Sequence, residues 1–264
     1  MGVLNVTPDS FSDGGRFNKL NVAVKHGLEM INDGADIIDI GGESTRPNSE
    51  PVTTSEELKR VIPVIKELKN QKQNIAISID TQKPEVAEKA IIAGADIIND
   101  VSGLQYSKET ADVAAHYNAT LILMHMQGTP KTMQNNIHYN NLLNNVKEFL
   151  LKSADTAQKA GVKKEQIVLD PGIGFGKTIE HNIAILSNIA FFKNTGYPLL
   201  VGPSRKSFIG TILNNDNPLS RDWGTAGAIA ALAAQKTDII RVHAVKEMVQ
   251  MLKVFETIKQ NIIN

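Results

Sequence analysis

Charged and amide side chains stand at or just after the ends of short apolar runs in this sequence, a position typical of a polar binding site. They are Asn5, Asp80, Asn99, His125, Asp170, Lys206, Arg241 and His243. A single Asp or Asn there is as well explained as a helix cap or a turn former. Lys206, Arg241 and His243 do not fit that explanation, because cations do not cap helix N-termini. The set as a whole predicts a site that combines carboxylates, amides and positive charge.

Arg241 and His243 are two residues apart in one apolar run. If this run is a strand, both side chains project to the same side. Two hydrogen-bonding cationic groups that converge on one point favour an oxyanion or a phosphate as ligand. His125 also follows an apolar run, but we interpret it as structural or as a support for neighbouring site residues.

These side chains can meet only if the apolar runs belong to one sheet. We predict strands over residues 2–5, 36–40, 75–80, 96–99, 120–125, 167–170, 199–202 and 239–243. We predict helices over 20–33, 55–70, 84–93, 107–117, 139–160, 179–188, 222–235 and 244–260. Apolar strands that alternate with helices indicate a parallel sheet covered by helices. Eight such units in 264 residues predict a single-domain (β/α)8 TIM barrel, in which the C-terminal ends of the strands meet on one face.

Two long segments, residues 6–17 and 41–53, follow the first and second predicted strands. Both are rich in Gly, Pro and Ser and are longer than a simple strand-to-helix connection. Long loops on this face of a barrel often close over a substrate. Phe11 and Arg46 favour that role over surface decoration, because an aromatic ring and a guanidinium are of little use on a solvated loop tip.

The composition argues against several functional classes. The formal net charge is zero, which removes any global electrostatic case for nucleic acid or an anionic membrane as partner. The absence of cysteine excludes disulfides and thiolate metal sites. No apolar run approaches the length of a membrane span, and no signal peptide precedes the first strand. We therefore expect a cytoplasmic protein whose partners are small molecules.

Seven segments resemble, in order, the motifs of the dihydropteroate synthase family: LNVTPDSFSDGG, GGESTRP, ISIDT, IINDVSG, DPGIGFGK, GPSRKSFIG and RVH. The resemblance spans nearly the whole chain and implies a (β/α)8 fold. It also implies the joining of 6-hydroxymethyl-7,8-dihydropterin diphosphate to 4-aminobenzoate, with release of diphosphate, in folate biosynthesis. Inhibition by sulfonamides, which imitate the aminobenzoate, and a homodimer are further implications of the resemblance.

The resemblance assigns recognition of the pterin ring to side chains from several strand ends. These are Asp80, Asn99, Val101, Met124, Asp170 and Lys206. Asp170 would accept the two parallel N–H donors of the pyrimidine edge, and Lys206 would donate on the opposite side. Val101 and Met124 would supply apolar contact. A site that satisfies every polar edge discriminates well, because a wrong ring leaves buried groups unpaired.

By the same resemblance the diphosphate lies at Asn5, Arg241 and His243, with Mg²⁺ coordinated by Asn5 and the loop held by Asp13. Mg²⁺ takes few protein ligands and keeps several waters, so one amide oxygen suffices. An aromatic amine is a weak nucleophile, which favours early loss of diphosphate. We therefore expect a dissociative (SN1-like) mechanism, in which Mg²⁺ and the two cationic side chains stabilise the departing charge.

The resemblance places the aminobenzoate beside the pterin. Its contacts would be Phe11, Thr45, Arg46, Pro47, Phe175, Gly202 and Ser207. Phe11, Pro47 and Phe175 would form the walls around the benzene ring, and backbone N–H groups near Ser207 would bind the carboxylate. The residues expected to act directly in turnover are Asn5, Asp80, Lys206, Arg241 and His243.

Two features depart from expectation. Asn48 stands where the family commonly has Gly, and Asn tolerates positive φ well enough to preserve the loop. The segment PGIGFGKT is similar to a phosphate-binding P-loop, but Pro171 replaces its first glycine, so we interpret that match as spurious.

Two other functions stay open from the sequence. A pterin-dependent methyltransferase shares the fold and the pterin-edge residues, but it would not need Arg46 or the GPSRKSFIG segment. A catalytically inactive barrel kept as a scaffold should have lost several strand-end polar groups, and none is lost here.

Overall fold

Alternating strands and helices make up the chain in the computed structural model, which describes residues 1–7, 16–44 and 49–261, and of 16–19 only the backbone. The described residues form eight strands: β1 (Gly2–Asn5), β2 (Ile37–Gly41), β3 (Ala76–Asp80), β4 (Ile97–Asp100), β5 (Thr120–Met124), β6 (Ile167–Asp170), β7 (Leu200–Val201) and β8 (Ile239–Ile240). The helices of this range are α1 (Arg16–Asn32), α2 (Thr54–Gln71), α3 (Pro84–Ile92), α4 (Glu109–His116), α5 (Leu142–Lys159), α6 (Ile179–Ser187), α7 (Ile189–Lys193), α8 (Ser207–Leu213), α9 (Asp222–Ala234) and α10 (Val245–Gln260).

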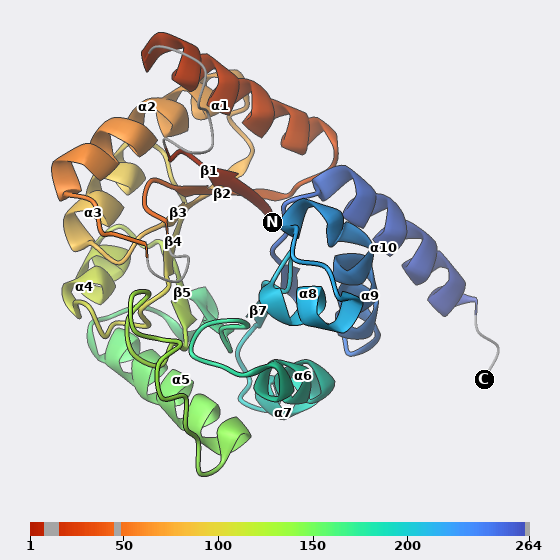
Figure 1. The fold of residues 1–264 in the computed structure, drawn as a ribbon. Coiled ribbons are helices and arrows are strands. Elements are labelled where there is room, and N and C mark those ends of the chain that lie inside the picture. The colour runs from red at the N-terminus through yellow and green to blue at the C-terminus, as the bar shows by residue number, and fades with distance from the viewer. Residues whose placement is uncertain (8–15, 45–48, 262–264) are drawn as a thin grey trace.

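The strands close into a barrel. β1 to β6 pair in sequence order as one parallel sheet, and β7 pairs with β8. Isolated bridges between Leu169 and Leu199 and between Gly2 and Val242 join the two sheets at both edges. The helices surround this ring of strands (Figure 1). The arrangement is the predicted single-domain (β/α)8 barrel, and that prediction is confirmed.

Each strand sends alternate side chains to its two faces, and the two faces have different chemistry. The outer face is apolar on every strand and packs under the helices in one large core, with residues such as Ile38, Ile79 and Leu121 fully buried. On the inner face, a second apolar cluster fills the N-terminal end of the barrel. It consists of Met1, Ile97, Ile122, Val168 and Leu200, with Ile37, Ala76 and Ile239 packed against it. Each of the strands β2 to β8 supplies one of these residues, and Met1 directly precedes β1.

The next inward residues on β2, β3, β4 and β6, two positions further along each strand, are polar and buried. They are Asp39, Ser78, Asn99 and Asp170. Parallel pairing sets Asp39 opposite Ser78, and Asp80 opposite Asn99. The inner face of the barrel therefore changes from apolar to polar toward the C-terminal ends of the strands, which places the polar residues on one side of a sealed floor.

Several predicted boundaries were wrong. β8 ends at Ile240, so Arg241 and His243 follow the strand, although the Val242 N–H still donates to the Met1 carbonyl at 2.9 Å. β7 contains only Leu200 and Val201, and β5 ends before His125. Neither α7 nor α8 has a predicted range, although a helix was expected to begin near Ser207. They have five and seven residues, too few for a helical period to be recognised.

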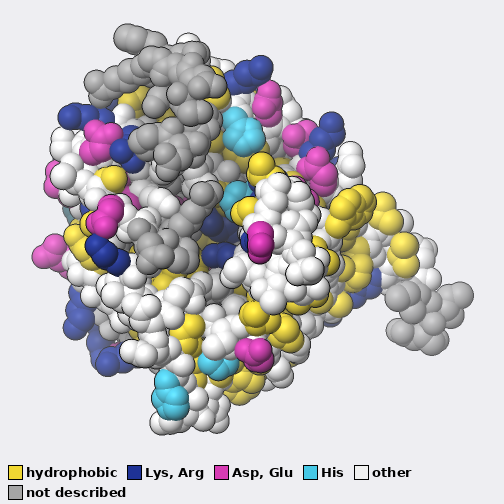
Figure 2. Space-filling view, viewed as in Figure 1, with side chains coloured by type: hydrophobic (Ala, Val, Ile, Leu, Met, Phe, Trp, Pro, Cys, Tyr) yellow, Lys and Arg dark blue, Asp and Glu magenta, His cyan; other side chains and the backbone are white. Residues whose placement is uncertain are grey.

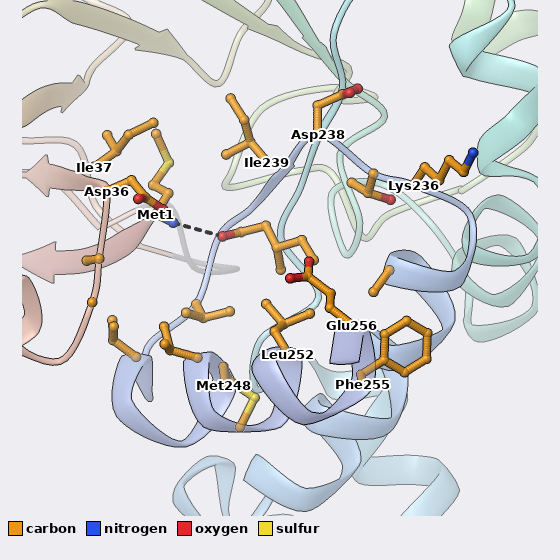
Figure 3. A pocket seen from close by; sticks show the side chains of 18 of the residues that line it. Met1, Asp36, Ile37, Lys236, Asp238, Ile239, Met248, Leu252, Phe255 and Glu256 are labelled. Atoms are coloured by element: carbon orange, nitrogen blue, oxygen red, sulfur yellow. Dashed lines mark hydrogen bonds between the residues drawn. The ribbon is translucent and has the colours of Figure 1, made fainter. Parts of the chain in front are cut away.

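A cavity of about 690 Å³ lies at the N-terminal end of the barrel, between the starts of the strands and α10. Met248, Leu252 and Phe255 of α10 line it, together with Ile37 and Ile239 (Figure 3). The inner apolar cluster contributes to its lining, whereas the described residues predicted for the binding site do not. This cavity is therefore distinct from the site predicted from the sequence.

Within the described residues, the helices are too short or too polar for any of them to cross a lipid bilayer.

Candidate active site

One guanidinium shared by two carboxylates lies at the centre of the polar layer. Arg241 Nε donates to Asp39 Oδ2 at 2.6 Å, and Arg241 Nη2 donates to Asp80 Oδ2 at 2.8 Å. Asp39 is fully buried, Asp80 is nearly so, and they come from adjacent strands. Hydrogen bonds between ionised groups are strong, so this cluster fixes the guanidinium relative to β2 and β3.

Asp39 was missed by the sequence analysis, because it lies inside an apolar run rather than at its end. The available signal was the run DIIDI, in which an acid stands in the middle of a strand whose inner face is spaced by two residues. The structure adds a second contact to it, from Asn99 Nδ2 to Asp39 Oδ2 at 3.2 Å. Asp39 therefore touches two predicted site residues.

Burial dominates the protonation of the acidic residues. Burial raises the pKa of Asp80 to about 7, and the like charge of Asp39 acts in the same direction although Arg241 opposes both. The ion pair and the raised pKa are compatible, because one guanidinium cannot fully compensate two buried carboxylates. The pKa of Arg241 is raised, with burial opposed by Asp39 and Asp80, so the charge on Arg241 is secure.

Asp170 ends β6 and accepts a hydrogen bond from the Gly172 N–H at 2.7 Å. Burial raises the pKa of Asp170 to about 6, against the Gly172 bond and the charges of Lys206, Lys177 and Arg241. Gly172 has φ +71°, and a Cβ there would lie 1.9 Å from the His125 carbonyl oxygen. Only glycine therefore allows the chain to turn here and return its N–H to the carboxylate.

Lys206 extends across the segment that follows β6. Its ammonium lies 4.0 Å from the centroid of the Phe175 ring, and a Cβ at Gly174 would lie 2.9 Å from its Cδ. Burial lowers the pKa of Lys206 to about 8, with Arg241 acting in the same direction and Asp170 and Asp80 opposing. These mutual charge effects place Asp80, Asp170, Lys206 and Arg241 in one electrostatic environment.

Lys206 was expected not to stand at a helix N-terminus, but it occupies the N-cap position of α8. Its side chain makes no capping hydrogen bond there. Arg205 fixes the segment before α8. Its guanidinium forms a bidentate ion pair with Asp222 at 2.7 and 2.8 Å. The backbone N–H of Arg205 also donates to Thr225 Oγ1 at 3.0 Å.

The predicted apolar contacts of the ring lie in one cluster. Val101, Met124 and Phe175 are buried together with Met126 and Met133, in a group separate from the two barrel cores. They come from the ends of β4, β5 and β6. An apolar surface thus lies beside the charged group, as a flat heterocycle with polar edges requires.

Asn5, His243 and Gly202 take positions around the same strand ends. A Cβ at Gly41 would lie 3.7 Å from Asn5 Oδ1 and 3.8 Å from Asp80 Oδ2, so Asn5 and Asp80 flank the same glycine. His243 Nδ1 lies 3.0 Å from Ser204 Oγ. A Cβ at Gly202 would be 3.6 Å from Arg241 Cβ, so this glycine lies directly beside the arginine. Ser207 begins α8 and is exposed.

Arg241 and His243 thus contact different partners. Both residues follow β8, so the alternation of side chains along a strand does not place them. Arg241 reaches Asp39 and Asp80, whereas His243 meets Ser204 in the segment after β7. Ser204 was not singled out from the sequence. Figure 2 shows Lys and Arg side chains in the hollow at the centre of this view down the barrel.

Lys177 is a second residue that the sequence analysis missed. It is buried, and its ammonium lies 2.9 Å from His125 Nδ1 and donates to the Phe175 carbonyl at 3.0 Å. Burial lowers the pKa of Lys177 to about 7. Burial and this lysine lower the pKa of His125 to about 2, so the imidazole is neutral and accepts. His125 also meets Phe149 edge-on at 4.9 Å, in keeping with a supporting role.

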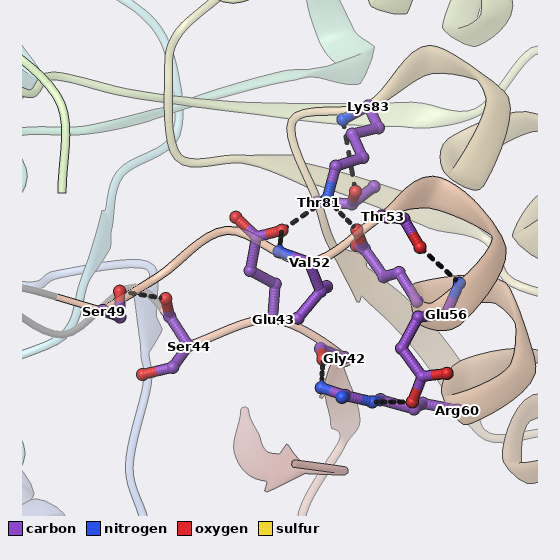
Figure 4. Close-up of polar contacts among 11 residues, drawn as sticks. Gly42, Glu43, Ser44, Ser49, Val52, Thr53, Glu56, Arg60, Thr81 and Lys83 are labelled. Carbon is purple, nitrogen blue, oxygen red and sulfur yellow. Dashed lines mark hydrogen bonds and ion pairs between the residues drawn. The ribbon is translucent and has the colours of Figure 1, made fainter. Parts of the chain in front are cut away.

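Five predicted contacts lie outside the described residues: Phe11, Asp13, Thr45, Arg46 and Pro47. The ends of the second long loop are described and are held tightly (Figure 4). Glu43 accepts hydrogen bonds from the Val52 N–H at 3.2 Å and from Lys83, and Ser49 Oγ donates to the Ser44 carbonyl at 2.5 Å.

Lys83 joins this loop to the barrel. It follows β3, is buried, and donates to Glu57 of α2 at 2.5 Å as well as to Glu43. Burial lowers the pKa of Lys83, but its two carboxylate partners prevail and raise it. A buried ammonium between two carboxylates therefore connects the loop end, α2 and the residues just after Asp80.

Asn5 offers a hard oxygen ligand that fits Mg²⁺, with the Asp80 carboxylate on the other side of Gly41. The described residues contain no group of three His, Cys, Asp or Glu side chains that could hold a metal by themselves. This donor set fits a cation that takes its remaining ligands from water and from a bound phosphate.

Comparisons with known proteins all point to one family. Residues 1–243 match the model of a family described as pterin binding enzyme. The dihydropteroate synthase of Synechocystis sp. is 50% identical over 258 residues, covering 98% of this chain and 89% of that protein.

Solved structures give the same result. The dihydropteroate synthase of Xanthomonas albilineans with 4-aminobenzoic acid has a TM-score of 0.93 and 40% identity, covering 100% of this chain and 93% of that one. The enzyme of Yersinia pestis in a sulfonamide drug complex has a TM-score of 0.92 and 42% identity, covering 98% and 94%.

The buried Lys83 cluster generates a prediction on stability. Lys83→Met leaves Glu43 and Glu57 together without their cation, and breaking a buried pair in this way costs about 3–5 kcal/mol. The measurement is the midpoint of urea unfolding. Lys89→Met is the matched control, because Lys89 is exposed on α3, the helix that begins right after Lys83, and its pair with Glu88 contributes about 1 kcal/mol at most. Equal effects of the two substitutions would contradict the structural role of Lys83.

The raised pKa of Asp80, about 7, generates a prediction on pH. Between about pH 4 and about pH 7, the native state holds a proton that the unfolded chain has released. The free energy of unfolding should therefore fall as pH rises through this window, and Asp80→Asn should flatten the fall. Urea unfolding at about pH 4.5 and about pH 7.5 measures the difference. The exposed Asp155→Asn is the control, and a wild-type slope in Asp80→Asn would refute the assignment.

Proposed function

Because the chain belongs to the pterin-binding enzyme family, we propose that it condenses 6-hydroxymethyl-7,8-dihydropterin diphosphate with 4-aminobenzoate to give 7,8-dihydropteroate and diphosphate in folate biosynthesis. The family match and the 50% identical relative confirm the resemblance of its motifs to dihydropteroate synthases, and with it the transferase class. The specific substrates, the metal and the mechanism are part of the proposal.

One observation carries the proposal: carboxylates, an amide and two cations from separate strand ends lie in one electrostatic environment, and one of these cations, Lys206, contacts an apolar cluster. Asp80, Lys206 and Arg241 interact electrostatically, and Asp170 does so with both cations. A pterin ring presents parallel N–H donors on one edge and acceptors on another. An ionised Asp170 would accept from the donor edge while Lys206 donates to the acceptor edge, with Val101 and Met124 against the flat face.

The diphosphate would lie where Arg241 meets the end of β1. The Arg241 charge is held by two carboxylates, and Asn5 lies across Gly41 from one of them. Asn5 would hold Mg²⁺, which would supply charge compensation for the leaving diphosphate. His243, placed by Ser204, would add a hydrogen bond to the same group.

The aminobenzoate would bind next to the Phe175 ring and the exposed start of α8 at Ser207. Lys206 lies over Phe175, so its ammonium stands between the two substrate sites. The contacts proposed for Phe11, Asp13, Thr45, Arg46 and Pro47 rest on the motif resemblance alone. The described ends of the second loop, held by Glu43 and Lys83, set where that segment begins and ends.

Bond cleavage would precede attack by the amine. The C–O bond to the diphosphate breaks, the dihydropterin ring delocalises the positive charge on its methylene carbon, and Arg241 and His243 stabilise the departing oxygen. The amine nitrogen then forms the new C–N bond and loses a proton. A cation on the substrate is tolerated because the single charge of Arg241 only partly balances the two carboxylates of Asp39 and Asp80.

A homodimer is also proposed, and exposed apolar side chains support it. Ile212, Leu213, Leu219 and Trp223 lie within one stretch from α8 to α9, and Trp223 is 87% exposed. Exposed apolar side chains gathered in one segment favour an interface, since apolar patches mark protein interfaces more often than scattered single residues do. A second copy of the chain is the partner that the resemblance implies.

Product formation tests the proposed reaction. The purified chain with both substrates and Mg²⁺ should form dihydropteroate, and a sulfonamide should compete with the aminobenzoate. Arg241→Ala and Lys206→Ala should each lower turnover by about 10²-fold or more, because each removes a preorganised cation. The measurement is product release at saturating substrates. The exposed Lys246→Ala is the control.

Removal of Mg²⁺ by chelation should weaken binding of the pterin diphosphate in the same preparation, measured by calorimetry. A chain that forms no product with both substrates and metal would refute the proposed function. Turnover of Arg241→Ala or Lys206→Ala at the wild-type rate would refute the assigned roles.

The association state tests the exposed apolar stretch. The wild-type chain should sediment as a dimer, and Trp223→Ser should shift it toward monomer at equal concentration, because the most exposed aromatic residue of the stretch is lost. Tyr106→Ser, at another exposed aromatic residue, is the control. A wild-type monomer would end this part of the proposal.

A further inference from the structure

The Asp39 carboxylate is buried in the barrel and contacts two residues that the proposed function assigns to different parts of one substrate. It has no exposed surface, and the same oxygen, Oδ2, accepts from Arg241 Nε and from Asn99 Nδ2. No motif or comparison assigns it a role. Its position between the ring-binding amide and the diphosphate-binding guanidinium is the observation from which this inference starts.

Asp39 determines which groups Arg241 can offer to a ligand. A guanidinium has five N–H donors in a fixed plane. The Nε donor is held by Asp39 at 2.6 Å, and one Nη2 donor by Asp80 at 2.8 Å. Nε joins the guanidinium to the rest of the side chain, so the bond to Asp39 sets the plane of the whole guanidinium. The remaining donors are then presented together, which suits the oxygens of a diphosphate.

Asp39 also determines which end of the Asn99 amide faces a ligand. An amide can present either its NH₂ group or its carbonyl oxygen. A carboxylate oxygen that receives hydrogen bonds accepts only the NH₂ group, which lies 3.2 Å away. The Asn99 carbonyl oxygen is thereby turned away from Asp39 as a free acceptor. The resemblance assigns Asn99 to the pterin ring, and in this orientation the amide would offer the ring an acceptor.

The cost of burying Asp39 indicates that stability is not its main contribution. Its second oxygen, Oδ1, has no hydrogen-bond partner among the described residues. A buried carboxylate with one unsatisfied oxygen is unfavourable for folding. Removing one partner of a buried ion pair is costly when it leaves the other charge uncompensated. Arg241 would keep Asp80 as a partner in such a variant.

We propose that Asp39 is a positioning residue that sets the hydrogen-bonding pattern of the site, by orienting Arg241 toward the diphosphate and the Asn99 carbonyl toward the ring. The inference rests on the proposed function, because it assigns Arg241 and Asn99 to the two parts of one substrate. Asp39 itself does not touch the ligand. Its effect is on affinity for both parts at once, through two different neighbours.

The test uses Asp39→Asn, which keeps the shape and removes the charge, in the full chain. Calorimetry measures the dissociation constants of two separate probes: inorganic diphosphate with Mg²⁺, and 6-hydroxymethylpterin without a diphosphate. Both constants should rise about tenfold, which corresponds to about 1.4 kcal/mol for each. A purely structural role would lower the fraction of competent protein, which calorimetry reports as stoichiometry, and would leave the dissociation constants unchanged.

Double variants identify the neighbours through which Asp39 acts. Asp39→Asn should add little to the loss of diphosphate affinity caused by Arg241→Ala, and little to the loss of pterin affinity caused by Asn99→Ala. Ser78→Ala is the matched control, because Ser78 is the register neighbour of Asp39 in the same buried layer and its hydroxyl has no partner among the described residues. It should bind both probes as the wild type does.

Unchanged dissociation constants in Asp39→Asn, or fully additive losses in both double variants, would overturn the inference. If Asp39→Asn does not fold, Asp39→Leu replaces it, since it removes the buried polar atoms as well as the charge, and the same outcomes apply. Failure of the wild type to bind either probe or to form product would overturn the proposed function instead. A wild type that binds and reacts beside an Asp39→Asn variant that does so equally well overturns only the role of Asp39.

Discussion

The shared ion pair of Arg241 with Asp39 and Asp80 is the interaction on which the site depends. One positive charge is held between two buried carboxylates from adjacent strands, and it is reached from the far end of the chain. Its geometry exists only when β8 lies beside β1, because the bridge from Gly2 to Val242 brings Arg241 over the ends of β2 and β3. Closure of the barrel and formation of the site are therefore one event in structural terms. A barrel left open at that edge would leave two carboxylates buried with no cation, at a large electrostatic cost.

Burial gives these groups their chemical character. The same desolvation raises the pKa of Asp80 and Asp170 and lowers the pKa of Lys206 and Lys177, so four groups that would titrate far from neutrality are brought close to it. The apolar floor of the barrel is the cause, since it excludes water from below the polar layer. Glycines complete the arrangement. Gly41 lies between Asn5 and Asp80, and Gly174 lets Lys206 pass close to the backbone.

Much of this arrangement could be predicted from the sequence, and the exceptions have physical causes. Alternation of apolar runs and helical segments predicted the barrel, because each run needs a buried outer face. Asp80 and Asp170 were found because they end their strands. Asp39 was missed because a strand-end rule does not see an acid in the middle of a run, and Lys177 because nothing local indicates that a lysine after a glycine-rich turn is buried. The end of β8 was placed too late, since Val242 continues the pairing as an isolated bridge after the regular strand has stopped.

The sequence by itself determined the fold class, the family and the types of side chain available at the strand ends, because hydrophobic periodicity and local motifs are written in consecutive residues. Only the tertiary structure decided which of these side chains meet. Asp39 and Arg241 are 202 positions apart, and Lys177 faces a histidine 52 positions away. Their pairing, and the pKa values that follow from it, depend on distances and burial across the barrel. Those quantities arise from the closed ring of strands and have no counterpart in any short stretch of sequence.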